Sequence, residues 1–312
     1  MSGVDLKLLS TLELPERVED RFRAHFSVVR GRLEEAEDIQ PDAILCSIRP
    51  DRFDRGAIAA LPSTVKMIAT YSVGYDHIDL QAAADRGIAV FNTPGVLSDA
   101  VADAAMLLLL GAARRATESI ALLRERRWTG WTPAQLIGTE LGGKTLGILG
   151  MGEIGRRVAR RARAFGMDIA YHNRREMPDE EARFQSDPRA LVAESDALLL
   201  AWPSTAETRR FIAADTLALA KPNLILVNIG RGDLVNDEDL IAALKAGRIS
   251  AAGLDVFDNE PAIHPGYLDL PNAFLLPHIG SSTWEARLAM ADILIRAIEA
   301  HTAGATPPNR IA

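Results

Sequence analysis

Cysteine is nearly absent from this 312-residue sequence, in which Cys46 is the only one. A single thiol excludes an internal disulfide framework and any zinc or iron–sulfur site built from several cysteines, and it fits a reducing compartment. Long apolar runs are also missing: stretches such as Ala104–Ala113 are too short to span a bilayer, and no signal peptide is evident. We therefore expect a soluble, cytoplasmic protein with no membrane partner and no bound metal.

Positive charge is in deficit, with 35 Lys and Arg residues against 42 Asp and Glu residues and a net charge of −7. An acidic chain is a poor candidate for non-specific binding to nucleic acid, so we expect no nucleic-acid partner. The hydrophobic share of 48% and the charged share of 25% are those of a globular protein and exclude wholesale disorder. The length fits one large α/β domain or two of moderate size.

Short apolar strands alternate with helical segments, which predicts parallel sheets. We expect strands at residues 43–46, 65–69, 88–91, 145–149, 168–172, 197–202, 224–228, 252–257 and 273–277, and helices at residues 80–86, 155–165 and 283–302. The second half predicts a doubly wound sheet whose strand C-termini face a common crevice. A long helix from Ala100 to about Arg124, capped by Asp99, follows a Pro-Gly turn and is expected to connect two domains.

The strongest local signal is a glycine motif between a predicted strand and a predicted helix, Gly150-Met151-Gly152-Glu153-Ile154-Gly155. In a dinucleotide-binding turn the first glycine permits the tight turn, the second lets the backbone approach the pyrophosphate, and the third allows close packing of helix on strand. The helix N-terminus offers N–H groups and a partial positive charge to the phosphates. The motif predicts a dinucleotide site, the alternative being an ordinary glycine-rich turn.

The next predicted strand ends in Asn173-Arg174-Arg175. NAD-binding units place Asp or Glu at this point to bind the ribose hydroxyls, and a carboxylate there would repel a 2′-phosphate. Arginine attracts that phosphate and forms forked, charge-assisted hydrogen bonds with it. We therefore expect NADP(H) as the preferred cofactor, with NAD(H) as the alternative if Arg174 and Arg175 are only a solvated charge pair. His172 either contacts the adenine or packs internally.

Three polar side chains follow predicted strand ends, where we expect the crevice of the sheet. Arg231 lies between two glycines, Glu260 follows the strand at 252–257, and His278 follows the strand at 273–277. Nicotinamide chemistry needs a cation for the substrate's carboxylate or carbonyl, a proton donor near its oxygen, and a group that tunes the donor. A Glu–His pair can supply the last two. The alternatives are a buried structural histidine, a cap-forming glutamate and a surface arginine.

The motifs also occur in a characteristic order. They are Gly150-x-Gly152-x-x-Gly155, Asn228-Ile-Gly-Arg231-Gly232, Leu254-Asp255-Val-Phe-Asp-Asn-Glu260-Pro261 and Pro277-His278-Ile-Gly280, preceded by Ser72–Asp79 and Asn92–Gly95. With them the chain resembles the D-2-hydroxyacid dehydrogenase family over nearly its whole length. It is most similar to the NADPH-preferring glyoxylate/hydroxypyruvate reductases of that family, enzymes that reduce small 2-keto acids to 2-hydroxy acids.

The resemblance implies an α/β fold of two Rossmann-like, doubly wound parallel-sheet domains. A flavodoxin-like substrate domain would comprise residues 1–98 and 286–312, and an NADP-binding domain residues 99–285. Arg231 would bind the substrate's carboxylate and carbonyl oxygen, His278 would donate the proton, and Glu260 would hold His278 protonated. The backbone of Val73 and Gly74 would hold the carboxylate. The cofactor would contact Val101, Met151, Gly152, Glu153, Ile154, Ile229, Asp255 and Gly280, with Asp255 on the nicotinamide amide.

The resemblance also implies a homodimer, built by the long helix and the loop that carries Trp128 and Trp131. The residues themselves leave open whether these tryptophans face a partner or pack on their own chain. Asp103 stands where many members carry Glu, so no role is assigned to it. The acid position holds Glu260 rather than Gln, which argues against the formate dehydrogenase branch.

Two other functions remain open at this point: a phosphoglycerate-type dehydrogenase, and a nucleotide-sensing, co-repressor-like binding protein of the same fold. The preferred keto acid is not fixed either. Ser47, Arg49 and Tyr75 can contact the substrate, although a packing or surface role is the simpler interpretation of each.

Overall fold

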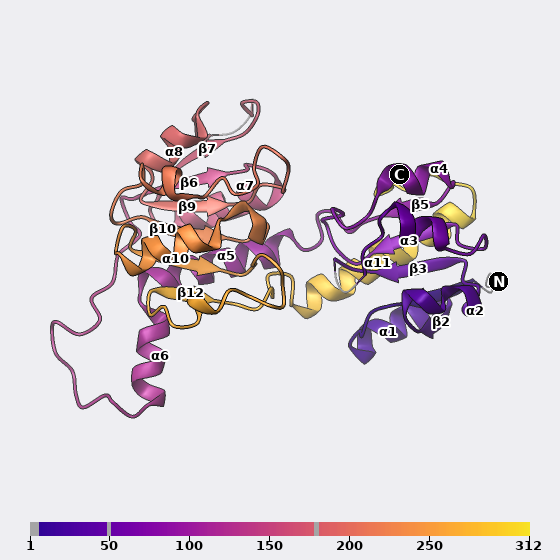
Figure 1. Ribbon diagram of the computed structural model, residues 1–312, viewed down its shortest axis with the longest axis horizontal. Helices are drawn as coiled ribbons and strands as arrows, with labels where there is room; N and C mark the ends of the chain where they lie inside the picture. Colours follow the sequence, from indigo (N-terminus) through magenta and orange to yellow (C-terminus); the bar gives the residue numbers. More distant parts are fainter. Residues whose placement is uncertain (1–5, 49–50, 178–180) are drawn as a thin grey trace. The chain divides into compact units, whose positions relative to one another are not determined.

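The structure, a computed structural model, describes residues 6–48, 51–177 and 181–312, and the chain forms two compact units. Unit 1 comprises Met1–Leu97 and Ser281–Ala312, and unit 2 comprises Ser98–Gly280 (Figure 1). Among the described helices, none is both long enough and apolar enough to cross a membrane.

The second crossing between the units lies at Gly280, five residues before the position 285 expected from the sequence. Local hydrogen bonds explain the difference. The N–H groups of Ile279 and Gly280 donate to the Asp255 carboxylate within unit 2, each at 2.8 Å. Three residues later, the Thr283 hydroxyl accepts from the N–H of Ala286 and caps the last helix, which belongs to unit 1.

Unit 1 is built on a five-stranded parallel sheet in the order β2-β1-β3-β4-β5. Its strands are β1 (Lys7–Ser10), β2 (Ser27–Arg30), β3 (Ala43–Cys46), β4 (Met67–Thr70) and β5 (Ala89–Phe91). Every residue of β3, β4 and β5 is buried, which explains why these three read as short apolar runs in the sequence.

Helices cover both faces of this sheet. They are α1 (Glu16–Arg23), α2 (Ala36–Ile39), α3 (Arg55–Ala60), α4 (Leu80–Asp85) and α11 (Trp284–Thr302), with a short 3₁₀ turn, η1 (Leu33–Glu35). Helices α1 and α11 pack against each other, and α11 contacts β4. A separate apolar core unites residues of α3 and α4 with the strands, including Ile44, Ile58 and Ile68.

Unit 2 contains a seven-stranded parallel sheet in the order β12-β11-β10-β9-β6-β7-β8. Its strands are β6 (Thr145–Leu149), β7 (Asp168–His172), β8 (Arg183–Phe184), β9 (Ala197–Leu200), β10 (Ile225–Asn228), β11 (Ala251–Leu254) and β12 (Ala273–Leu275). The strand order reverses between β6 and β9, which is the doubly wound arrangement. Both sheets are parallel throughout, so the predicted α/β class is confirmed.

The two faces of this second sheet carry different helices. These are α5 (Ser98–Ala113), α6 (Ala116–Arg124), α7 (Glu153–Ala164), α8 (Pro188–Glu194), α9 (Ala214–Leu217) and α10 (Asp237–Lys245), with 3₁₀ turns η2 (Gly232–Leu234) and η3 (Pro265–Tyr267). Neighbours in β6 show the alternation. A Cβ on Gly147 would meet Ser195 and Leu191 at the end of α8, whereas Ile148 faces Gly155 of α7.

The single long helix expected from Ala100 to Arg124 is wrong, because the structure contains two helices there, α5 and α6. Arg115 has a left-handed φ of 53° and so ends the first helix. The carbonyl of Ala113 accepts a hydrogen bond from the distant N–H of Thr139 at 2.8 Å. The break therefore depends on a residue far along the chain.

The sequence predicted that Asp99 caps this helix, but α5 already begins at Ser98, so Asp99 lies inside it. Its carboxylate pairs instead with Arg157 and Arg161 of α7, at 3.1 Å each. The hydrogen bond from Arg157, with that from Arg161, holds the pKa of Asp99 below its usual range. Asp103 pairs with Arg161 at 2.6 Å, so both carboxylates join α5 to α7.

A charged network anchors the start of β6. The Asp196 carboxylate accepts from the N–H of Thr145 at 3.0 Å, from Lys221 at 2.9 Å and from Asn223 at 3.2 Å. Burial favours the neutral acid, but these donors outweigh it and lower the pKa of Asp196 below its ordinary 3.8. The carboxylate therefore stabilises unit 2 in its charged form.

Candidate active site

The glycine motif forms a tight turn between β6 and α7. Gly150 has a φ of 105°, and a Cβ there would lie 2.7 Å from the backbone carbon of Ala201. A Cβ on Gly155 would lie 2.3 Å from the carbonyl oxygen of Gly150, so helix and strand require a glycine there. No atom of the described residues lies within 4 Å of a Cβ on Gly152, so a ligand can approach the backbone at that point.

The first turn of α7 is equipped to bind an anion. Helix α7 has twelve residues and Gly152 as its N-cap, and among the described residues no side chain caps it. The N–H groups of Glu153 and Ile154 in its first turn therefore have no side-chain acceptor there. Met151 is buried beside them. Backbone donors together with the helix dipole suit a pyrophosphate, so the residues present fit a dinucleotide.

The side chain of Asn173 is hydrogen-bonded to the backbone of the glycine turn at Met151. Its side-chain oxygen accepts from the N–H of Met151 at 2.8 Å, and its amide donates to the Met151 carbonyl at 3.5 Å. Arg174 and Arg175 follow, are exposed, and have no hydrogen-bond or ion-pair partner among the described residues. His172 packs internally: its ring stacks on Phe184, and its Nδ1 lies 2.9 Å from the carbonyl of Gln185.

Glu260 and His278 form a directly bonded pair. Nδ1 of His278 lies 2.7 Å from Oε2 of Glu260, and Oε1 accepts from the N–H of Phe257 at 2.8 Å. The imidazole is partly exposed, with 38% of its side chain accessible against 17% for the glutamate. Because Nδ1 is engaged by the carboxylate, Nε2 is the nitrogen that can pass a proton to a bound molecule.

Asp255 fixes the segment that carries the histidine. It is 2% exposed and accepts from the N–H groups of Ile279 and Gly280 at 2.8 Å. Burial raises the pKa of Asp255, although the two N–H donors oppose the rise. A Cβ on Gly280 would lie 2.9 Å from Oδ2 of Asp255 and 3.5 Å from Cγ2 of Val101. The structure thus brings together three residues predicted for the cofactor.

Arg231 follows β10 in a backbone that admits no bulk. A Cβ on Gly232 would lie 1.9 Å from the backbone carbon of Phe257, which packs this segment against the chain leading to Glu260. The side chain of Asn228 donates to the Arg231 carbonyl at 2.9 Å and accepts from the N–H of Gly230 at 3.0 Å. Ile229, also predicted for the cofactor, is buried between these residues.

Val73 and Gly74 belong to unit 1, in the loop after β4. Their carbonyls are engaged: Asn92 donates to Val73 at 2.9 Å, and Ser72 donates to Gly74 at 2.6 Å while bonding to Thr70 at 2.7 Å. In the described part of the chain, the N–H groups of Val73 and Gly74 have no acceptor. Two adjacent backbone donors are suited to a carboxylate.

Asn92 and Asn309 were not found from the sequence, although they support this loop. Asn309 is 5% exposed and donates from its side chain to the Asn92 carbonyl at 2.7 Å, while its own carbonyl accepts from the N–H of Asn92 at 3.3 Å. The C-terminal residues continue along β5, where Ile311 donates to Val90 at 2.9 Å. The lone signal was the Asn-Thr-Pro-Gly motif at residues 92–95.

The remaining candidate residues lie at several places. Ser47 donates weakly to the Tyr71 carbonyl (3.5 Å), and Tyr75 is 42% exposed. Arg49 lies outside the described residues. Trp128 and Trp131 are 53% and 79% exposed, so half or more of each side chain is accessible on the single chain.

A doubly wound sheet with this glycine turn, and with a hydrogen-bonded carboxylate–imidazole pair after its strands, is an arrangement typical of NAD(P)-dependent dehydrogenases. The sequence profile of the D-isomer specific 2-hydroxyacid dehydrogenase, NAD binding domain, matches residues 106–280. The chain belongs to this family, and the predicted family is confirmed. The protein is an NAD(P)-dependent 2-hydroxyacid dehydrogenase.

Named relatives are similar over nearly the whole chain. The glycerate dehydrogenase of Hyphomicrobium methylovorum is 43% identical over 91% of this chain and 92% of its own. The glyoxylate reductase of Thermococcus litoralis is 44% identical over 88% and 85%. A solved NADPH-dependent glyoxylate/hydroxypyruvate reductase from Sinorhizobium meliloti, in complex with NADP and malonate, is 34% identical over 99% and 97%, with a TM-score of 0.90.

Proposed function

We propose that the protein reduces glyoxylate and hydroxypyruvate to the corresponding 2-hydroxy acids, with NADPH as the preferred reductant. The observation that carries the proposal is the hydrogen-bonded Glu260–His278 pair, next to the segment that Asp255 holds through the N–H groups of Ile279 and Gly280. Relatives named glyoxylate reductase and glycerate dehydrogenase support the substrate class. The bound cofactor supplies the hydride for the keto carbon.

We assign a different role to each of His278, Glu260 and Arg231. His278 donates the proton from Nε2 to the keto oxygen, while Glu260 holds Nδ1 at 2.7 Å and stabilises the charged ring. Arg231 binds the carboxylate and the keto oxygen through its guanidinium, which presents forked donors. The N–H groups of Val73 and Gly74 would bind the substrate's carboxylate, because they have no acceptor among the described residues.

The cofactor would lie on the glycine turn from Gly150 to Gly155, with the N–H groups of Gly152, Glu153 and Ile154 toward its phosphates. Asp255 would accept from the nicotinamide amide, next to Val101, Ile229 and Gly280. Arg174 and Arg175 would bind the 2′-phosphate, since both guanidinium groups are exposed and have no partner among the described residues. Asn173 contributes through its hold on Met151.

The reaction is tested by the loss of nicotinamide absorbance with glyoxylate, hydroxypyruvate, pyruvate, phenylpyruvate and phosphohydroxypyruvate, each with NADPH and with NADH. We expect fast turnover of the two small acids with NADPH. Turnover of phosphohydroxypyruvate alone would instead favour a phosphoglycerate-type enzyme. NADPH binding without any turnover would favour a sensing protein.

The cofactor preference is tested by replacing Arg174 and Arg175 together with methionine. The double variant should raise KM for NADPH at least about tenfold and leave KM for NADH within a factor of two, since each charge-assisted bond to the phosphate contributes about 1.5–3 kcal/mol. The matched control replaces Arg183 and Arg189, whose side chains are 54% and 43% accessible and are already paired with Glu194 and Asp215. Equal losses for both cofactors would contradict the assignment.

We further propose a homodimer formed through α6 and the segment after it, which project from the sheet of their own unit (Figure 1). This segment exposes Trp128, Trp131 and Ile137, the last at 68%, and Leu123 of α6 is 60% exposed. Exposed apolar side chains gathered in this way favour a protein interface. Sedimentation should give twice the chain mass of 33.8 kDa, and replacing both tryptophans with serine should shift it toward the monomer.

A further inference from the structure

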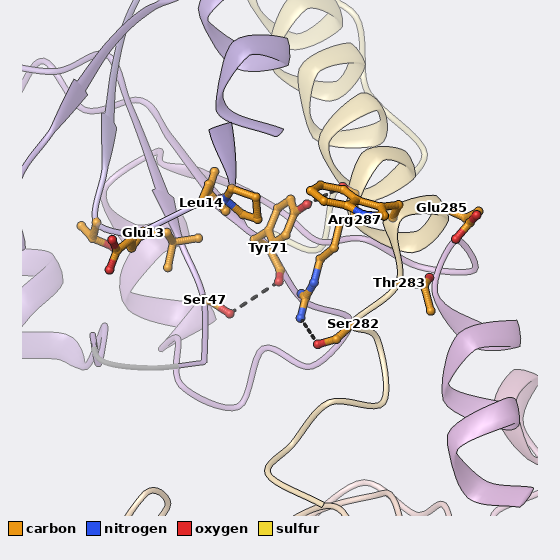
Figure 2. A pocket seen from close by; sticks show the side chains of 12 residues that line it. Glu13, Leu14, Ser47, Tyr71, Ser282, Thr283, Glu285 and Arg287 are labelled. Carbon is orange, nitrogen blue, oxygen red and sulfur yellow. Dashed lines mark hydrogen bonds between the residues drawn. The ribbon is translucent and has the colours of Figure 1, made fainter. Parts of the chain in front are cut away.

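Unit 1 contains a cavity of about 820 Å³ that none of the roles above uses. Its wall comes from the residues that follow three strands: Thr11–Pro15 after β1, Ser47 after β3 and Tyr71 after β4. The wall is completed by Ser282, which precedes α11, and by Arg287 in the first turn of that helix (Figure 2).

The position of the cavity in the sheet is informative. The strand order β2-β1-β3-β4-β5 reverses between β1 and β3, because the chain adds β2 on one side of β1 and β3 on the other. In open parallel sheets, ligands bind beyond the strand C-termini at such a switch point. The cavity lies at that point in unit 1, so its place in the topology independently favours a ligand.

Arg287 is the cation in this cavity. Its guanidinium lies 5.9 Å from the centre of the Tyr71 ring, and its Nη2 donates to the Ser282 hydroxyl at 2.9 Å. Figure 2 shows the side chain running from α11 between these two residues. The Tyr71 hydroxyl donates to the Arg287 carbonyl and so fixes the start of the helix beside the ring.

No carboxylate in the described part of the chain pairs with Arg287, although the side chain is half-buried and burial lowers its pKa. Arginine has five N–H donors, and the described residues accept from one nitrogen only. A partly desolvated cation without a counter-ion is costly unless a ligand supplies the acceptor. Glu13 and Glu285 also line the cavity, but both are exposed.

The cavity lies close to the loop assigned to the substrate carboxylate. Tyr71 precedes Val73 by two residues, a separation of at most about 7 Å along the backbone. A keto acid whose carboxylate lies on the N–H groups of Val73 and Gly74 can therefore direct the far end of its carbon chain toward Arg287.

We propose that this cavity binds the distal oxygen of the substrate, with Arg287 as the donor: it selects 2-keto acids that carry a hydroxyl or carboxylate beyond the keto carbon. This inference rests on the proposed function. Glyoxylate has no such group, hydroxypyruvate has the smallest one, and a second carboxylate is the best complement of a guanidinium.

Hydroxypyruvate and 2-oxobutyrate provide the sharpest comparison, because they differ in shape only by a hydroxyl in place of a methyl group. The wild type should prefer hydroxypyruvate in kcat/KM, and R287M should reduce that preference at least about tenfold, the usual effect of losing a charge-assisted hydrogen bond. R287K keeps the positive charge but not the forked donors, so its preference for hydroxypyruvate should lie between those of the wild type and R287M. This second variant keeps the test decisive if R287M does not fold.

Arg17 offers a matched control, since its guanidinium lies 5.5 Å from the centre of the Trp284 ring but does not line the cavity. R17M should retain the wild-type preference within a factor of two. If R287M lowers kcat/KM for both acids equally, or changes neither, Arg287 does not recognise the distal oxygen and the inference is wrong.

Calorimetric titration with malonate, a dicarboxylate that cannot be reduced, separates this inference from the proposed function. Malonate should bind R287M at least about tenfold more weakly than it binds the wild type and R17M. If the wild type reduces no keto acid but malonate binding depends on Arg287, the proposed reaction fails and the anion site stands. Equal malonate affinity in wild type and R287M would overturn the anion site, whatever the activity.

Discussion

Replacing Asp255 with asparagine should loosen the segment that carries His278. The carboxylate accepts two hydrogen bonds at 2.8 Å, from the N–H groups of Ile279 and Gly280. Asparagine keeps one acceptor oxygen and turns an NH₂ group toward the other N–H. One bond to a charged acceptor is lost, about 1.5–3 kcal/mol, and a buried donor is left unsatisfied, about 1–3 kcal/mol. Relief of the buried charge offsets part of this, so we expect a net loss of about 2–4 kcal/mol.

Hydrogen exchange measures this loss of stabilising free energy directly at the amides of Ile279 and Gly280. Since about 1.4 kcal/mol corresponds to a factor of ten, exchange at Ile279 and Gly280 should accelerate roughly 30- to 1,000-fold. Turnover should fall with it, because the imidazole loses its fixed position. The control is D269N, at an exposed aspartate of the same unit, which should change neither. Unchanged exchange at both amides in D255N would refute the reasoning.

Three further variants test other parts of the structure. G232A places a methyl group 1.9 Å from the backbone carbon of Phe257, so thermal stability should fall by about 1–3 kcal/mol and keto-acid turnover with it. D196N should cost about 1–3 kcal/mol at pH 7. Because the folded pKa of Asp196 lies below 3.8, its contribution is complete above that pH, and the gap from wild type should shrink as pH falls below it. N309A should raise KM for the keto acid several-fold, since Val73 loses its indirect support, and leave KM for the cofactor unchanged.

Each of these has a result that would contradict it. G142A is the control for the first, because a Cβ there makes only an ordinary contact of 3.7 Å, and equal stability of the two alanine variants would refute the steric argument. A D196N gap that grows on acidification would reverse the assigned sign. A rise in cofactor KM for N309A, with normal keto-acid KM, would separate Asn309 from the carboxylate loop.

Apolar runs in the sequence predicted most of the buried strands of the two sheets correctly. The strands at 43–46, 145–149 and 168–172 have the expected bounds, because fully or largely buried parallel strands require apolar runs. Strand β2 (Ser27–Arg30) was missed, since it lies at the sheet edge and is polar at both ends. The break between α5 and α6 was missed because it involves Thr139, which no periodicity near Ala113 can reveal.

The candidate site also combines contacts that the sequence predicted with contacts that it did not. The pairing of Glu260 with His278 was expected from their places after two strands, and the structure joins them at 2.7 Å. The contact between Asn173 and Met151 was not, because an asparagine at a strand end suggests a ligand contact as readily as a backbone one. Asn309 lies 217 residues from Asn92, so that its support of the Val73–Gly74 loop depends wholly on the folded chain.

The central claim is that His278, held by Glu260, protonates the keto oxygen during NADPH-dependent reduction. The most direct test is single-turnover reduction of glyoxylate by wild type and H278Q, with NADPH affinity measured for both by fluorescence. We predict a loss of roughly 10²- to 10⁴-fold in the rate of reduction for H278Q, the usual contribution of a general acid, with NADPH affinity within a factor of two. An H278Q rate equal to that of the wild type would contradict the account.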